Sequence, residues 1–323
     1  MQKVDYSIFY KHSFSKVEDL NRKKYDIVIS CYNNSARVKT IFDAIQAPTK
    51  HWLIFPEYMF MPEDLPHTGK IFKFSTGFTE ADTISEYFSK SEIEDWISKE
   101  ICVDITGFIR PHLIFFVLYI KKLGVKKVDF IYTDPNKYIK KEETLFSTDS
   151  FESRQINGCE GTHSPDTSND YLIIGAGYDY NRINDIVKFK NNTTKVHLFG
   201  FPSLQPDMYQ ENILKASNVI DNSASKGDAS FLDEKYMIMA PANDPFITAQ
   251  SLQEFISKRN QEKNITNLYL SPLSTKAQTL GFALYYSYEC QNKPVSIIFP
   301  FSKQYNKETT EGISKIWKYT VEF

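Results

Sequence analysis

Residues 101–123 read ICVDITGFIRPHLIFFVLYIKKL, and this stretch decides the fold. Its first part, 101–105, is a mostly apolar run without polar alternation, which is typical of a strand buried on both faces. Thr106 and Gly107 then predict a turn. Pro111 opens an apolar segment of helical period, because proline is favoured in the first turn of a helix. A strand that leads directly into a helix is the unit from which α/β sheets are built.

The same alternation of strand and helix continues through most of the chain. Further strand-like runs span residues 25–31, 51–55, 127–132, 171–174, 195–199, 236–240, 267–270 and 295–299. Segments of helical period span residues 35–45, 80–99, 111–123, 180–188, 246–259 and 275–291. The pattern predicts an α/β protein with a doubly wound, mostly parallel Rossmann-like sheet, or two such sheets, flanked by helices.

A polar, turn-rich stretch at residues 135–170 interrupts this alternation. A long connection of this kind marks a domain junction or a long active-site loop. The sequence therefore predicts an N-terminal Rossmann-like layer over residues 1–150 and a C-terminal one over residues 151–323. One continuous domain is the alternative.

The overall charge excludes a protein coated with basic residues for binding nucleic acid. The 323 residues include 38 Lys and Arg against 40 Asp and Glu, for a formal net charge of −2. A nucleic-acid coat has a clear basic excess instead. We therefore expect no extended nucleic-acid-binding surface, and any site for an anion has to be local.

Membrane, disulfide and metal signals are also missing from the sequence. The longest apolar stretch, 113–120, has eight residues, whereas a membrane span needs about 20. Cysteines 31, 102, 159 and 290 form no CxxC pair, and the first residues lack the profile of a secretory signal. No histidine lies four residues from another or beside a cysteine. We expect free thiols, a cytoplasmic location, no membrane contact, no metal site and no evident cofactor.

Ligands of open α/β sheets bind beyond the carboxyl ends of the strands, so candidate residues are those that follow the predicted strands. After the run 25–31, Asn34 tolerates a left-handed turn and Ser35 is a helix N-cap. These two residues either cap the helix only or also bind a ligand at its N-terminus.

A second candidate follows the run 101–105, where Thr106, Gly107 and Arg110 precede or begin a helix. Backbone N–H groups, the positive end of the helix dipole and one guanidinium together bind a phosphate or a carboxylate. Asp104, at the end of the run, is either a buried carboxylate bonded to loop amides or a catalytic group.

The strongest local signal is the segment that contains Ser271, Ser274, Thr275 and Lys276, between a predicted strand and a predicted helix. Hydroxyl groups, an ammonium and the free amides of a helix start favour an anion. The segment lacks the spacing of a P-loop, so nucleoside triphosphate hydrolysis does not follow. Helix capping beside a solvated lysine is the alternative.

Two other strand ends carry candidate ligand-binding residues. Gly175 and Gly177 predict a slim turn that lets a ligand approach the backbone, although a GxG pair alone is a weak dinucleotide signature. Asn243 and Asp244 stand in a rigid turn before a helix. They either read a ribose or base edge, with Asp244 as a general base, or they only shape the turn.

Glu160 is the third catalytic candidate, beside Asp104 and Asp244. It lies between Cys159 and His163 in a loop that combines a carboxylate, a thiol and an imidazole. A cysteine nucleophile needs a positioned base and a depressed pKa, and neighbours on one loop rarely point at the same atom. The alternative is a loop without a catalytic role.

Aromatic residues make up 15% of the chain. Most fall within predicted strands and helices, where core packing accounts for them. Others stand just past the strand ends, where a ring is placed to stack on a planar base. These are Tyr32, Tyr58, Phe108, Tyr178, Phe201 and Phe246.

Two strand-end motifs resemble those of CRISPR-associated Rossmann-fold (CARF-like) domains. They are VDITG at 103–107 and LSPLSTK at 270–276, each before a helix. In that family, such loops surround a cyclic or linear oligonucleotide, often at a dimer interface, and the ligand switches an attached effector. The resemblance implies a sensing or partner subunit of a bacterial antiviral defence or regulatory system. Where the family has Gly-Gly before Thr-Lys, this chain has Leu273 and Ser274.

The sequence thus leads to three functional hypotheses. The first is binding or sensing of a nucleotide or other phosphorylated small molecule at the carboxyl edge of the sheet, with a protein partner or a homodimer. The second is a hydrolase or transferase that acts on a nucleotide-like substrate. The third is a non-catalytic interaction subunit.

Overall fold

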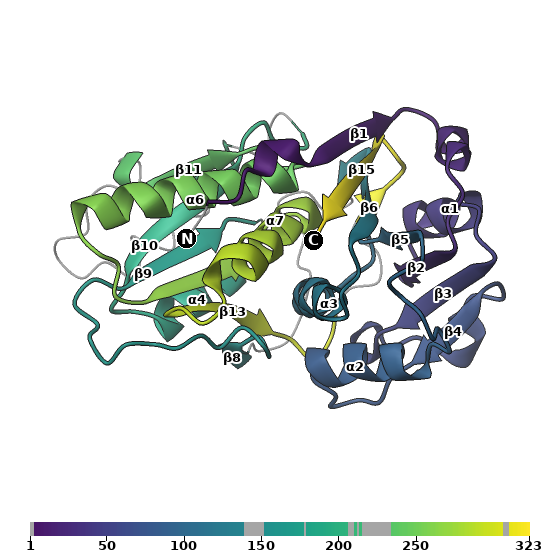
Figure 1. Ribbon diagram of the computed structural model, residues 1–323, viewed down its shortest axis with the longest axis horizontal. Coiled ribbons are helices and arrows are strands. Elements are labelled where there is room, and N and C mark those ends of the chain that lie inside the picture. Colours follow the sequence, from purple (N-terminus) through teal and green to yellow (C-terminus); the bar gives the residue numbers. More distant parts are fainter. Residues whose placement is uncertain are drawn as a thin grey trace. The chain divides into compact units, whose positions relative to one another are not determined.

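The computed structural model of the chain describes residues 3–138, 152–177, 179–205, 210–211, 213–214, 234–305 and 310–323. The chain forms two compact units (Figure 1). One consists of Ile8–Asp149 and Ser302–Phe323, and we call it the seven-stranded unit after its main sheet. The other consists of Met1–Ser7 and Ser150–Phe301, and we call it the six-stranded unit.

The sheet of the seven-stranded unit has the order β1-β15-β6-β5-β2-β3-β4. Its strands are β1 (Tyr10–Phe14), β2 (Ile27–Cys31), β3 (Thr49–Ile54), β4 (Lys70–Lys73), β5 (Ile101–Asp104), β6 (Lys127–Asp134) and β15 (Lys315–Glu322). Strands β2 to β6 are parallel, and β15 runs antiparallel to both of its neighbours. A separate pair joins β7 (Lys137–Tyr138) to β14 (Thr310–Glu311).

The sheet of the six-stranded unit has the order β11-β10-β9-β12-β13-β8. Its strands are β8 (Glu152–Gln155), β9 (Tyr171–Gly175), β10 (Thr194–Gly200), β11 (Met237–Ala240), β12 (Leu268–Pro272) and β13 (Val295–Phe301). Strand β8 is antiparallel to β13, and the other pairs are parallel.

The parallel strands of the two sheets follow the same lateral order. Numbered along the chain within each unit, both sheets read 3-2-1-4-5, which is the order of a Rossmann fold. The order reverses between β2 and β5 in one sheet and between β9 and β12 in the other. Both units are therefore mostly parallel α/β layers, and the predicted fold class is confirmed.

Strands β3 and β4 are joined through short 3₁₀ turns, whereas the other described connections between parallel strands contain α-helices. They are α1 (Ala36–Ala44), α2 (Glu80–Lys90), α3 (Arg110–Lys122), α4 (Tyr180–Phe189), α6 (Pro245–Glu262) and α7 (Lys276–Tyr285), which a π-helical turn (Tyr286–Cys290) continues. Short 3₁₀ turns span Tyr6–Ile8, Val17–Arg22, Pro56–Tyr58, Pro62–Asp64 and Glu234–Tyr236. Thr79, Asp179, Asp244 and Thr275 are N-caps, as is Ser35, because each side chain accepts a hydrogen bond from a first-turn amide.

Helices cover both faces of the seven-stranded sheet. Phe42 of α1 stacks on Trp52 of β3, with 3.7 Å between ring centroids. The neighbouring His51 instead meets Tyr87 of α2, with 2.9 Å between its Nδ1 and the tyrosine hydroxyl. Successive residues of a strand point to opposite faces, so α1 and α2 lie on opposite sides of the sheet.

The predicted division at residue 150 differs from the observed units at both ends of the chain. Residues 1–7 belong with the six-stranded unit, and residues 302–323 belong with the seven-stranded unit. Strand β15 pairs with β6 from Lys315 to Glu322 and buries Ile316 and Tyr319. Long-range pairing places this last strand in the seven-stranded unit. Its run 316–321 is rich in β-branched and aromatic residues, a strand signal that the prediction missed.

The predicted helix 80–99 ends early, at Lys90. The Ser91 hydroxyl donates to the Phe88 carbonyl at 2.8 Å, and Glu92 has a φ of 63°, a left-handed conformation that stops a helix. Trp96 is nevertheless buried against Phe88, with 4.7 Å between ring centroids. The apolar residues beyond Lys90 are spaced as in a helix, but the chain there folds back onto α2 instead of continuing it.

Of the strands in the two main sheets, four had no predicted counterpart, namely β1, β4, β8 and β15. They lie at the edges of the sheets or next to an edge, where polar residues interrupt the apolar run. None of the four cysteines is in a disulfide, as the sequence predicts, and all four are buried. None of the helices in the described part of the chain is long and apolar enough to cross a membrane.

Candidate functional site

The predicted site residues divide between the two units. Asn34, Ser35, Thr106, Gly107 and Arg110 belong to the seven-stranded unit. The six-stranded unit holds Gly175, Gly177, Asn243, Asp244, Ser271, Ser274, Thr275 and Lys276. Each set lies at the carboxyl ends of the parallel strands of its own unit and forms its own candidate site.

In the seven-stranded unit, the loop after β5 packs directly on the end of β2, where the strand order reverses. A Cβ atom at Gly107 would lie 1.9 Å from the Cys31 carbonyl oxygen, so only glycine fits here. The Tyr58 hydroxyl donates to the Gly107 carbonyl at 3.1 Å. At this place, where the strand order reverses, the two backbones are in contact and no open crevice separates them.

Asp104 is fully buried at the end of β5. The Ser30 hydroxyl donates to its Oδ2 at 3.0 Å, and the Thr106 amide donates to its Oδ1 at 3.0 Å. Burial raises the pKa of the Asp104 carboxyl, and these hydrogen bonds and the charge of Arg37 oppose the rise. The geometry matches the structural alternative, a buried carboxylate that holds the loop after β5.

Ser35 caps α1, with its Oγ accepting from the Arg37 amide at 3.3 Å. The Arg37 side chain is buried and donates to the Thr133 carbonyl and, at 2.8 Å, to Thr310 Oγ1. It therefore ties the start of α1 to the end of β6 and to β14. Arg110 begins α3 and is half-buried.

A cavity of about 460 Å³ opens beside Asn34, and we call it the Asn34 cavity. Its volume is within the range of about 300–1,000 Å³ that is usual for small-molecule sites. It combines residues after β2, on α1, on β3 and in the segment 63–68. They are Tyr32, Asn34, Lys39, Asp43, Trp52, Glu63, Asp64, Leu65, Pro66, His67 and Thr68.

Lys39 is the ammonium group of the Asn34 cavity. Its Nζ donates to Asn34 Oδ1 at 2.6 Å and lies 5.6 Å from the centroid of the Tyr32 ring. Both of these partners are uncharged, and Lys39 has no ion pair with any described residue. The Tyr32 hydroxyl donates to the Asp64 carbonyl at 2.7 Å, which holds the segment 63–68 at the cavity.

The carboxylates of the Asn34 cavity limit the charge of its ligand. Asp43, Glu63 and Asp64 line it together with Lys39 and His67. Three carboxylates repel a ligand with several negative charges, since like charges at short range disfavour one another. Carboxylates also accept hydrogen bonds from hydroxyl groups, as an acidic residue does from ribose in dinucleotide-binding folds. The lining suits a ligand with one anionic group and several hydroxyls.

The sequence indicated only part of this cavity. Asn34 and Tyr32 were candidates because they follow a strand. Lys39 lies four residues after Ser35, a spacing that places both on the same side of α1. This spacing could have indicated Lys39 as a residue of the cavity. The segment 63–68 reaches the cavity only through the fold, and no pattern in the sequence marks it.

In the six-stranded unit, the loops after β9 and β12 contact each other. A Cβ atom at Gly177 would lie 2.2 Å from the Leu273 carbonyl oxygen, and one at Gly175 would lie 2.9 Å from Ser274 Oγ. The Leu273 amide donates to the Gly175 carbonyl at 3.0 Å. Both predicted glycines are thus required by close packing between two loops.

Polar groups gather at the start of α7. Thr275 Oγ1 accepts from the Gln278 amide at 3.1 Å and donates to the Ala242 carbonyl. Ser271 Oγ and Gln278 Oε1 are buried and have no hydrogen-bond partner among the described residues. Lys276 begins the helix and is half-buried. Within the predicted cluster, Thr275 caps α7, which matches the alternative in which this segment serves helix capping.

Asp244 is buried and caps α6. Its Oδ1 accepts from the amides of Phe246 and Ile247 at 3.0 and 3.1 Å. The preceding Asn243 is half-buried. These contacts match the alternative in which Asp244 shapes the turn before the helix.

We expect Asp244→Ala to lower the free energy of unfolding of the six-stranded unit by about 1 kcal/mol, because an N-cap is lost. Asp244→Asn retains an oxygen acceptor and should keep most of the stability. Denaturant unfolding followed by far-ultraviolet circular dichroism measures both. An equal loss in the two variants would show that the charge of Asp244 matters rather than its capping.

Glu160 lies at the opposite edge of its sheet from Asp244. The Thr162 amide donates to the Lys293 carbonyl at 2.9 Å, just before β13 begins, so this loop is at the amino ends of the parallel strands. Glu160 Oε1 accepts from the Gly158 amide at 3.0 Å, and Cys159 is buried. Glu160 therefore does not join the carboxyl-edge residues.

The aromatic residues past the strand ends take different positions. Tyr32 lines the Asn34 cavity, although it is itself buried. Tyr58, Phe108 and Phe246 are buried, whereas Phe201 is 53% exposed. Tyr178 lies outside the described residues.

Comparisons with known proteins give little further information. No family model matches the chain, and no curated protein matches it. A solved structure of CobK precorrin-6A reductase is similar over 87% of this chain and 90% of that chain, at 11% sequence identity and a TM-score of 0.25. A similarity this weak supports no statement about function.

Proposed function

We propose that the seven-stranded unit binds a small molecule with one phosphoryl group and a hydroxyl-bearing sugar, such as a nucleoside monophosphate or a sugar phosphate. The observation that carries the proposal is the Asn34 cavity, about 460 Å³ in volume, with Lys39 on its wall. The Asn34 end of the cavity lies at the carboxyl edge of the parallel strands, where ligands of open α/β sheets bind.

Five polar side chains of the Asn34 cavity have a role in this proposal. Lys39 binds the phosphoryl group, because its ammonium has only an amide oxygen and a ring as partners among the described residues. Asn34 orients Lys39 through the 2.6 Å hydrogen bond. The carboxylates of Asp43, Glu63 and Asp64 accept hydrogen bonds from sugar hydroxyls.

Calorimetric titration of the full chain with nucleoside monophosphates, sugar phosphates and short oligonucleotides tests the proposal. We expect a monophosphate to bind, and Lys39→Ala to weaken it about tenfold or more, because a charged hydrogen bond is lost. Lys126→Ala is the matched control. Its side chain is exposed and comes just before β6, at the amino edge of the same sheet, so it should change nothing.

Equal affinities of Lys39→Ala and the unaltered chain would contradict this assignment. An oligonucleotide that binds more tightly than every monophosphate would contradict the charge argument. It would instead favour the ligand-sensing role in a defence or regulatory system that the resemblance to CRISPR-associated domains suggests.

A further inference from the structure

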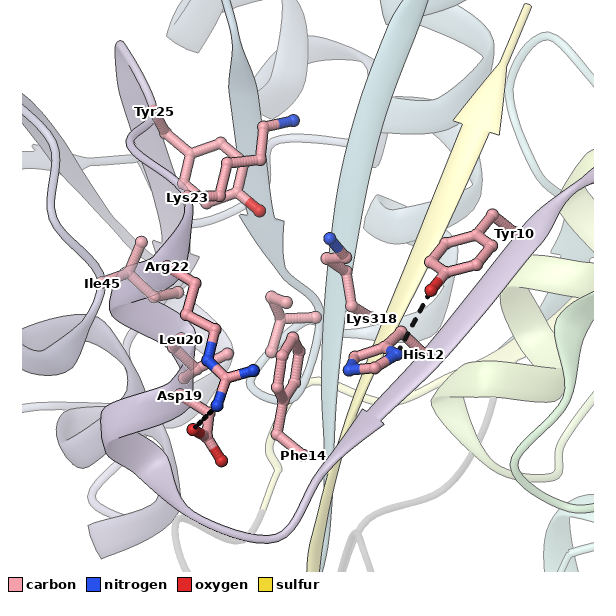
Figure 2. A pocket seen from close by; sticks show the side chains of 11 residues that line it. Tyr10, His12, Phe14, Asp19, Leu20, Arg22, Lys23, Tyr25, Ile45 and Lys318 are labelled. Carbon is pink, nitrogen blue, oxygen red and sulfur yellow. Dashed lines mark hydrogen bonds and ion pairs between the residues drawn. The ribbon is translucent and has the colours of Figure 1, made fainter.

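A second cavity of the seven-stranded unit, of about 200 Å³, is separate from the Asn34 cavity and shares no lining residue with it. We call it the Lys318 cavity. It lies between the segment 17–25 and strands β1 and β15 (Figure 2). His12 of β1, Lys318 of β15 and Ile131 of β6 line it from adjacent register positions, so they share one face of the sheet.

Lys318 places an ammonium with unused donors in this cavity. Its side chain is only 18% exposed, and its nearest carboxylate oxygen, Asp129 Oδ2, is 3.9 Å from Nζ. That distance allows an ion pair and is too long for a hydrogen bond. Lys318 makes no hydrogen bond with any other described residue. The ammonium has three donors, so a ligand with acceptor oxygens inside the cavity can bond to it.

Asp129 does not supply that acceptor, because Lys318 lies beyond hydrogen-bond distance and three other donors bond to the carboxylate. Lys23 Nζ lies 3.0 Å and the Tyr25 hydroxyl 2.8 Å from Oδ2, and Thr320 Oγ1 donates to Oδ1 at 2.6 Å. Lys23 also pairs with Glu100 at 2.7 Å, so its charge is balanced on two sides. Lys318 is therefore the ammonium of this group that lacks a hydrogen-bond acceptor among the described residues.

Two further basic side chains line the cavity from other segments. Arg22 pairs with Asp19 at 2.8 Å through one nitrogen, and its side chain is 77% exposed. His12 contacts the Tyr10 hydroxyl through Nδ1 at 3.3 Å, which leaves Nε2 for another partner. Figure 2 shows Arg22, His12 and Lys318 around the same space.

We propose that the Lys318 cavity binds a phosphoryl group, either inorganic phosphate or the terminal phosphate of a small molecule. Oxygen atoms of a phosphate supply the acceptors that Lys318 lacks, and Arg22 and His12 add donors. The volume of about 200 Å³ is below the lower end, about 300 Å³, of sites that enclose a whole small molecule. It therefore suits a charged head group rather than a complete cofactor.

Titration of the full chain with inorganic phosphate, followed by calorimetry, tests this site. We expect millimolar or tighter binding that Lys318→Gln weakens about tenfold and that Lys318→Arg largely retains. Arg22→Ala should weaken it severalfold. Because Arg22 is exposed, this variant keeps the test valid even if Lys318→Gln fails to fold.

Lys122→Ala removes an exposed ammonium of α3 that lines neither cavity, so it is the control that should leave phosphate binding unchanged. Lys39→Ala distinguishes this site from the Asn34 cavity. The proposal is overturned if the unaltered chain binds no phosphate, or if neither Arg22→Ala nor Lys318→Gln changes the affinity. Loss of phosphate binding in Lys39→Ala alone would also overturn it, and would place the phosphate in the Asn34 cavity.

Discussion

Replacement of Gly107 by alanine is expected to destabilise the seven-stranded unit by about 3 kcal/mol, the upper end of what overpacking costs. The new Cβ atom would lie 1.9 Å from the Cys31 carbonyl oxygen. That oxygen belongs to the backbone of a central strand, which pairs on both sides with β3 and β5 and cannot move away as a side chain does. The loop after β5 has to shift instead, and it would lose the Tyr58 hydrogen bond.

Tryptophan fluorescence isolates this effect, because all three tryptophans, Trp52, Trp96 and Trp317, belong to the seven-stranded unit. Gly77→Ala is the control. Gly77 has a φ of 89° and open space around its Cα, so alanine there adds strain without a clash and should cost about 1 kcal/mol. A loss for Gly107→Ala no larger than for Gly77→Ala would contradict the packing argument.

Gly177→Ala is the matched variant in the other unit. Its Cβ atom would lie 2.2 Å from the Leu273 carbonyl oxygen. Circular dichroism should show an earlier unfolding transition, whereas the fluorescence transition of the seven-stranded unit should stay in place. A shift of both transitions together would show that the two units unfold as one.

Acidification is expected to destabilise the protein through two buried histidines. Burial lowers the pKa of His51 and of His197 to about 4, from an ordinary value of 6.5. Between these values the unfolded chain binds protons that the folded chain does not. The stability that each neutral histidine contributes is therefore complete above pH 6.5 and is lost as the pH falls towards 4. At pH 5 the loss is about 2 kcal/mol for each.

The free energy of unfolding, measured from pH 7.5 to 4.5, checks this prediction. His197→Leu should flatten the dependence in circular dichroism, because His197 is fully buried with neither ring nitrogen paired to a described residue. His51 belongs to the seven-stranded unit, so tryptophan fluorescence in the same titration follows the unfolding to which it contributes. His67→Ala is the control, since its side chain is exposed. An unchanged slope in His197→Leu would contradict the assignment.

Much of the fold follows from local sequence. Runs such as 25–31 and 101–105 are apolar enough to require burial on both faces, and the segments between them repeat at helical spacing. The helix caps are equally local, since Ser35 and Thr275 bond to amides within three residues of themselves. These features predicted the parallel sheets, most of the helices and the alternative structural roles of Asp104 and Asp244.

The sites depend on contacts that local sequence does not encode. Lys39 and Asn34 are close in the chain, but the segment 63–68 reaches them only because β3 and β4 place it there. The Lys318 cavity joins residues 12, 22 and 318, which meet because β15 returns to pair with β6 and β1. Neither cavity is visible as a motif.

The sequence by itself determined that this is an α/β protein of Rossmann type with caps and glycines at the strand ends. Hydrophobic burial and helix capping act over a few residues, so their pattern is written along the chain. The tertiary structure alone decided which unit each end of the chain joins, the strand order 3-2-1-4-5 in each unit, and which charged side chains share a cavity. These outcomes depend on strand pairing between distant residues, whose backbone hydrogen bonds are the same for almost any side chain.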